Sequence, residues 1–73
     1  MEYDKKDILE YIVIVVSEYS KRHNISDIEA FRYIKNFDGL DHLVKHYGVL
    51  HTLSFDDAMD DVDKISQRKG GLL

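Results

Sequence analysis

The fold of this chain is decided by residues 7–23, which read DILEYIVIVVSEYSKRH. Apolar residues recur here at the period of an α-helix and gather on one side, while polar residues take the opposite side. The β-branched run 12–16 also favours a strand, but the polar stripe and the length favour a helix. We therefore predict a helix over residues 4–23, capped by Asp4 before it and by a left-handed Asn24 after it.

The apolar arc of this helix is wider than a surface helix needs. Val13 lies at the border of the arc and Ile14 falls among the polar positions. The arc therefore spans about 200°, where a stripe of about 100° would suffice. Such a helix either lies at the centre of a small bundle or offers a face to a partner. Both interpretations stay open, and Val13 with Ile14 marks the candidate partner surface.

Two shorter helices are expected next. One covers residues 26–36 and opens with SDIE, a capping box in which Ser26 and Glu29 bond each other's backbone N–H groups. The other covers residues 40–47 and is expected to end at Gly48. The apolar residues that follow, VLHTL, are predicted to form an extended connector against the core.

A last helix is expected to begin at the cap Ser54 and to stop at the glycine pair 70–71. Together these elements predict an all-α fold, a small single-domain bundle over residues 1–73 with three main helices and a short fourth. A chain of this size buries only roughly 60% of its unfolded surface, so its core is thin. The side chains expected in that core are Ile8, Ile12, Val15, Val16, Tyr19, Ile28, Ala30, Phe31, Ile34, Phe37, Leu40, Leu43, Val44, Tyr47, Phe55, Ala58, Met59, Val62 and Ile65.

The charge balance weighs against nucleic-acid binding. The chain carries 14 acidic and 10 basic residues, a formal net charge of −4, and its basic residues are scattered along the sequence. Phosphate contacts dominate nucleic-acid affinity and leave a basic footprint. A helix-turn-helix built from residues 26–36 and 40–47 is the weakest alternative, because the second of these helices has few basic residues.

The sequence shows neither a membrane span nor a signal peptide. The apolar run YIVIVV at residues 11–16 follows acidic residues, lacks a small-residue cleavage site and is far shorter than the ~20 residues of a span. Cysteine is absent, so that neither a disulfide nor a thiolate metal site can form. We therefore expect a cytoplasmic protein that does not enter the membrane.

Residues 54–62, SFDDAMDDV, contain four aspartates. Their spacing matches the Asp-Asp-x-x-Asp signature with which isoprenoid synthases bind magnesium and a diphosphate. That chemistry needs a deep apolar cavity, which this thin core cannot enclose, and a second aspartate motif is missing. The start of a helix is favoured, where each anion gains about 0.3–1 kcal/mol. We expect Asp60 to pair with Lys64 and Asp61 with Lys64 or Arg68. The resulting candidate docking patch is acidic: Asp56, Asp57, Asp60 and Asp61.

The histidines are candidate ligands of a metal or of a small molecule. His42 and His46 stand four apart, as in zinc-binding helices, but no third ligand is identifiable and both are expected to face solvent. His51 is expected to lie near the core, where it and Thr52 would hydrogen-bond backbone groups at a helix end. Recognition of a ligand by His51 beside Tyr47 is the alternative.

Signatures of catalysis are missing from the sequence. We find no serine–histidine–acid spacing, no glycine-rich phosphate loop and no redox motif. We therefore expect a protein that is not an enzyme and that has no catalytic residues, no cofactor and no bound metal.

Two long stretches carry a family resemblance, YGVLHTLSFDDAMDDV at residues 47–62 and DILEYIVIVVSEYSKRHNISDIEAFRYI at residues 7–34. They resemble a small bacterial domain-of-unknown-function family, number three-seven-nine-one. Its members share an apolar first helix, an aromatic-rich second helix and a Tyr-x-x-Leu-His-Thr stretch. The resemblance covers nearly the whole chain and implies a cytosolic, non-catalytic helical protein. The positions that match the stretch are Tyr47, Leu50, His51 and Thr52.

The resemblance also implies a genomic context. Genes of that family often adjoin a gene for a protein similar to ADP-ribosyltransferases, an arrangement like that of toxin–antitoxin pairs. Our leading hypothesis is a small acidic interaction module, antitoxin-like or an accessory partner of that neighbour. It would dock through Val13, Ile14 and the four aspartates. The alternative is a homo-oligomer in which Val13 and Ile14 pair with their own copies.

Overall fold

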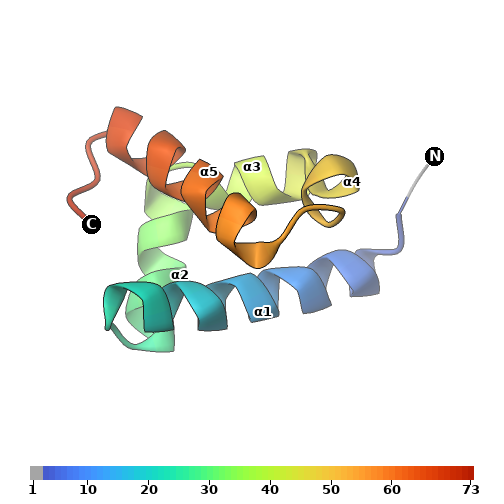
Figure 1. The fold of residues 1–73 in the computed structure, drawn as a ribbon, viewed down its shortest axis with the longest axis horizontal. Helices are drawn as coiled ribbons and strands as arrows, with labels where there is room; N and C mark the ends of the chain where they lie inside the picture. The colour runs from blue at the N-terminus through green and yellow to red at the C-terminus, as the bar shows by residue number, and fades with distance from the viewer. Residues whose placement is uncertain (1–2) are drawn as a thin grey trace.

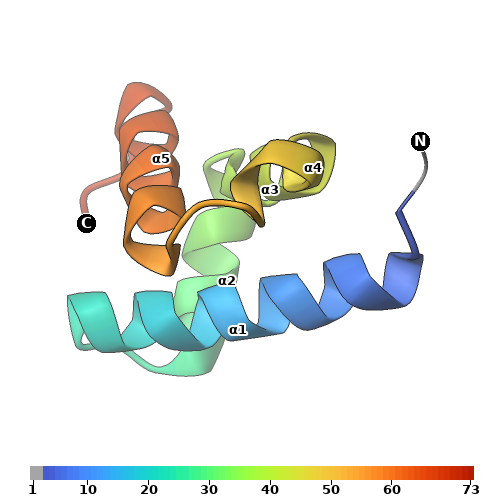
Figure 2. The same cartoon turned by 45° about the vertical axis from the view of Figure 1, so that its right-hand side comes forward.

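The computed structural model describes residues 3–73, and these residues form five α-helices joined by short turns. No strand occurs within them, so the predicted all-α class is confirmed. α1 runs along one side of the molecule, and α2, α3 and α5 pack against it (Figure 1). In Figure 2, α5 and the α3–α4 pair stand on the same side of α1. The helices are α1 (Lys5–His23), α2 (Asp27–Asn36), α3 (Gly39–Lys45), α4 (Tyr47–Leu50) and α5 (Phe55–Arg68).

Both ends of α1 are capped as predicted. The Asp4 side chain accepts a hydrogen bond from the Lys6 N–H at 3.0 Å and so satisfies one free donor of the first turn. Asn24 adopts the left-handed conformation with φ 55°, which ends the helix and turns the chain towards α2. The basic residues of the last turn complement the helix dipole there.

The starts of α2 and α5 also follow the predicted capping chemistry. The Ser26 hydroxyl accepts the Glu29 N–H at 3.1 Å, and the Glu29 carboxylate accepts the Ser26 N–H at 3.2 Å. The hydrogen bond from the Ser26 N–H to the carboxylate, together with the nearby Ser26 hydroxyl, holds the pKa of Glu29 below its usual value. At α5, the Ser54 hydroxyl accepts the Asp57 N–H at 3.1 Å.

The segment between α2 and α5 differs from the prediction of one short helix followed by an extended connector. The helix breaks at His46, whose φ of −108° and ψ of 18° are not helical, and resumes as the single turn α4. Gly48 therefore lies inside α4 and does not end a helix. The predicted extended connector is wrong, because Leu53 donates its N–H to the Leu50 carbonyl at 3.0 Å and closes a turn.

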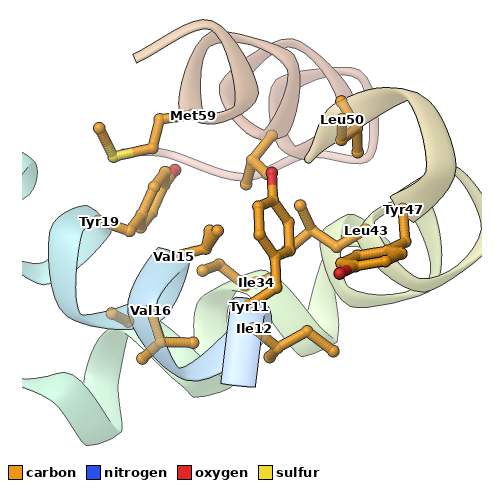
Figure 3. Close-up of a cluster of buried hydrophobic side chains, with 12 residues drawn as sticks. Tyr11, Ile12, Val15, Val16, Tyr19, Ile34, Leu43, Tyr47, Leu50 and Met59 are labelled. Atoms are coloured by element: carbon orange, nitrogen blue, oxygen red, sulfur yellow. The ribbon is translucent and has the colours of Figure 1, made fainter. Parts of the chain in front are cut away.

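The core lies where all five helices meet, and Figure 3 shows their side chains converging there. Val15, Ile34 and Leu43 are among its fully buried members. None of the helices in residues 3–73 has the length and apolar character that crossing a bilayer requires. The buried apolar side chains are Tyr11, Ile12, Val15, Val16, Tyr19, Ala30, Ile34, Leu43, Tyr47, Leu50, Ala58, Met59 and Val62.

Four side chains expected in the core lie on the surface instead: Ile28, Phe31, Val44 and Phe55 are exposed. On α2, the apolar residues form two arcs that share Ile34: one contains Ile28 and Phe31, and the other contains Ala30. Only the arc with Ala30 and Ile34 faces the core. The small Ala30 side chain lets α2 approach closely, which leaves Ile28 and Phe31 on the flank of the helix. Tertiary contacts therefore decide which arc is buried, and periodicity alone does not.

Candidate functional site

An open apolar groove lies between α1 and α2. Its volume is about 640 Å³. Leu9 and Val13 form its α1 wall, and Ile28 and Phe31 form its α2 wall. The floor is made by Ile12 and by other residues that also contact the core. All lining residues are Leu9, Ile12, Val13, Val16, Ser17, Asp27, Ile28, Phe31, Arg32, Lys35 and Asn36.

The four wall residues are largely exposed to solvent. The exposed fractions are 61% for Leu9, 60% for Val13, 65% for Ile28 and 40% for Phe31. Single exposed apolar side chains are common on soluble proteins, whereas a contiguous group of them marks an interaction surface. The four wall residues therefore form one exposed apolar surface along the groove.

The charged side chains along the groove are distributed unevenly. Asp27 lies in the first turn of α2, where the helix dipole favours an anion, and its carboxylate accepts the Ser20 hydroxyl at 2.6 Å. Arg32 and Lys35 are exposed, and among residues 3–73 neither forms an ion pair. An acidic chain thus presents two uncompensated cations beside its apolar groove.

The structure separates the two residues predicted to form an apolar partner surface. Val13 lines the groove. Ile14 is 45% exposed but is not part of the groove lining. Since Ile14 follows Val13 by about 100° of helical rotation, it lies farther from α2 on the outer side of α1. Beside Val13, the groove is lined by Leu9 and by Ile28 and Phe31. Ile28 and Phe31 were expected in the core.

The predicted acidic patch is partly engaged in ion pairs. Asp60 pairs with Arg22 near the end of α1, and Asp61 lies 3.4 Å from the His42 Nε2 atom. Within residues 3–73, the partners predicted from local spacing, Lys64 and Arg68, form no such pair, because tertiary contacts with α1 and α3 prevail. Asp56 and Asp57 occupy the first turn of α5 as expected. Two of the four carboxylates therefore hold helices together.

Asp63 is the centre of a polar cluster that the sequence did not single out. Its carboxylate accepts the Tyr19 hydroxyl at 2.5 Å, lies 3.0 Å from the His23 Nε2 atom and lies 3.8 Å from the Arg22 Nε atom. Burial and this hydrogen bond raise the pKa of Tyr19 well above its usual value. The cluster fixes the C-terminal half of α1 to α5, so its role is structural.

The histidine pair His42 and His46 forms no recognisable metal site. Their ring centroids lie 4.8 Å apart, and His42 is turned towards Asp61. In the part of the chain that the structure describes, no group of three or more potential ligands is arranged to hold a metal ion. His23, the last residue of α1, packs against Tyr19 and contacts Asp63.

The residues Tyr47, Leu50, His51 and Thr52 form a compact turn at α4. Tyr47 and Leu50 are buried. The His51 Nδ1 atom lies 2.7 Å from the Tyr47 carbonyl, and the two rings stack at 4.6 Å. The Thr52 hydroxyl donates to the Val49 carbonyl at 2.6 Å. The predicted backbone hydrogen bonds are confirmed. The expected position of His51 close to the core is wrong, since the residue is exposed.

Comparison with known proteins places the chain by its sequence alone. No curated protein and no solved structure is significantly similar to it. Residues 10–69, which include α2 to α5 and most of α1, match one family whose printed description is "Protein of unknown function (DUF3791)". Because this match spans most of the chain, the protein belongs to the DUF3791 family.

Proposed function

We propose that this protein is a non-catalytic interaction module that binds a partner protein through the groove between α1 and α2. The observation that supports this proposal is the contiguous exposure of Leu9, Val13, Ile28 and Phe31 in one groove. Burying such a surface against a partner would gain roughly 25 cal/mol for each Å² of apolar area removed from water.

The charged groups along the groove favour binding over catalysis. The Asp27 carboxylate already accepts the Ser20 hydroxyl. The Arg32 and Lys35 side chains are hydrogen-bond donors that offer no acceptor, whereas a general base needs a group that can accept a proton. A binding role therefore accounts for the groove without a chemical step.

An antitoxin-like or accessory role is the specific form of this proposal. The family resemblance names a candidate partner, the ADP-ribosyltransferase-like protein whose gene often adjoins those of the family. Docking through a groove on a small module would let the partner be held, and its activity blocked or supported, without any chemistry from the module.

Co-purification of the chain with the neighbouring gene product tests the proposal. We expect a complex at micromolar concentration that is lost with Val13→Glu, because a charge in the groove must be desolvated without a partner. Ile14→Glu is the matched control and should leave the complex intact. Absence of any complex, or equal loss with both variants, would contradict docking in the groove. Light scattering of the isolated chain separates this result from self-association through Ile14.

A further inference from the structure

The shape and charge of the groove specify what occupies it. We propose that the occupant is one amphipathic α-helix of the partner, with an apolar stripe flanked on one side by acidic residues. This inference rests on the proposed function, because it assumes that the groove between α1 and α2 is the docking surface.

The wall residues are spaced to receive a helix. Leu9 and Val13 are four residues apart on α1, and Ile28 and Phe31 are three apart on α2. Each pair is thus separated by about one helical turn, or roughly 5–6 Å. A helix laid in the groove presents apolar side chains at the same spacing, at positions i, i+3 or i+4, and i+7.

The backbone around the groove offers no hydrogen-bond partner to an extended peptide and so favours a helix. Both walls are helices, whose interior N–H and C=O groups already bond one another. An extended segment would enter an apolar groove with its own backbone groups unpaired, which costs free energy for each group. A helix satisfies these groups internally and brings only side chains to the groove.

Arg32 and Lys35 define the charge of the occupant. Both line the groove on the α2 side and neither is paired with a carboxylate in residues 3–73. They follow Ile28 and Phe31, respectively, by four residues, so each cation lies one turn from an apolar wall residue on the same helix. Acidic residues that flank the apolar stripe of a partner helix would meet them, and complementary charge fixes orientation and accelerates association.

A second copy of the chain fits this groove poorly. In a two-fold dimer the groove of one copy meets the groove of the other, and each groove is lined by one carboxylate, Asp27, and two cations, Arg32 and Lys35, so both carry an excess of positive charge. Two surfaces with the same excess charge complement each other less well than surfaces of opposite charge. The amphipathic faces of α2 and α5 are also committed to the core, through Ile34 and Val62 among others. The charges therefore favour a different protein as the source of the helix.

NMR titration of the full chain with two synthetic helices tests this inference. The helices share roughly 18 residues, long enough to be helical, and an identical leucine stripe, and they differ only in flanking Glu or Lys residues. We expect the Glu helix to bind at least about tenfold more tightly at low salt, a difference of about 1.4 kcal/mol, and the difference to shrink as salt screens it. The amide shifts should concentrate at Leu9, Val13, Ile28 and Phe31.

Matched variants connect the result to individual side chains. Ile28→Glu should abolish binding of both helices, and Ile14→Glu should leave it unchanged. The double variant Arg32→Glu, Lys35→Glu should reverse the preference towards the Lys helix. These positions are exposed, so the fold tolerates the changes, which circular dichroism verifies.

Three outcomes would overturn the inference. Equal binding of both helices would contradict the proposed acidic residues of the occupant. Amide shifts centred on α5 would show that the helix binds elsewhere than in the groove. If neither helix binds, the proposal of a helical occupant is wrong, whether or not the groove takes up a small apolar dye. The proposed function has a separate criterion, since it fails when capture of the neighbouring gene product does not respond to Val13→Glu.

Discussion

Asp63 gathers three polar contacts between α1 and α5 on one carboxylate, in addition to the pair that Asp60 forms with Arg22. Tyr19 is fully buried and donates its hydroxyl to this carboxylate, while His23 and Arg22 approach it from the last turn of α1. These partners lie 40 or more residues away in the sequence, so no local pattern indicates the cluster. Capping residues such as Asp4 could be predicted, because a cap acts on N–H groups only two or three residues away.

Replacing Tyr19 with Phe should lower the free energy of unfolding by about 1.5 kcal/mol near neutral pH. A hydrogen bond to a charged group contributes roughly 1.5–3 kcal/mol, and water can reach the partly exposed Asp63, which favours the lower end. Urea denaturation of both proteins measures the difference. Tyr33→Phe is the control, because its hydroxyl accepts only the Leu73 N–H at 3.2 Å and should cost less.

The effect of Tyr19→Phe should depend on pH in a defined direction. The pKa of Tyr19 is raised in the folded protein, so its contribution is complete below the unfolded pKa of about 10. This contribution is lost as the pH rises towards the folded pKa. The stability difference between the two proteins should therefore shrink above about pH 10. A difference that grows with pH would contradict this assignment.

At the scale of the element, α2 shows which features of a helix can be predicted from local sequence and which cannot. Its start could be predicted from the sequence SDIE, because the capping box is local. Its buried face could not be predicted in the same way. Ile28, Phe31 and Ile34 form one apolar arc at a spacing of three, and Ala30 and Ile34 form another at a spacing of four. Contacts with α1, α3 and α5 bury the arc with Ala30 and leave Ile28 and Phe31 in the groove. The groove as a whole could therefore not be predicted from the sequence, although Val13 was predicted to belong to a partner surface.

Alanine substitutions at two isoleucines of α2 distinguish these arcs. Ile34→Ala should cost about 3 kcal/mol, because it empties a fully buried site. Ile28→Ala should change stability by at most about 0.5 kcal/mol, as is usual for exposed positions. Thermal or urea unfolding of the two variants measures both values. Similar losses at the two sites would place Ile28 in the core and contradict the open groove.

At the scale of the whole molecule, a thin core makes every helix contact important. A chain of 73 residues has an expected stability of roughly 4–11 kcal/mol. Gly39 lies where α2, α3 and α5 meet, and a Cβ atom there would lie 3.1 Å from the Ile34 Cγ2 atom and 3.2 Å from the Val62 Cγ1 atom. The missing side chain allows these helices to pack closely. Composition predicted a small bundle, but the role of this glycine depends on the three-dimensional packing.

Gly39→Ala should destabilise the protein by about 1 kcal/mol. Alanine gains about 1 kcal/mol of helix propensity over glycine, whereas overpacking a core typically costs 1–3 kcal/mol. The new Cβ would also lie 3.1 Å from the Ile34 carbonyl oxygen, which, as part of the backbone, moves less easily than a side chain. Urea denaturation gives the sign directly, and a stabilised variant would show that the three helices can move apart.

A partner bound in the groove between α1 and α2, as proposed above, would also change how long the chain survives in a cell. A ligand that binds only the folded state raises the free energy of unfolding by about 2.7 kcal/mol when its concentration is a hundred times its Kd. This gain is a large share of the expected stability of the chain. Cellular proteases degrade chains in proportion to the fraction that unfolds. The abundance of this protein should therefore rise and fall with the supply of whatever fills the groove.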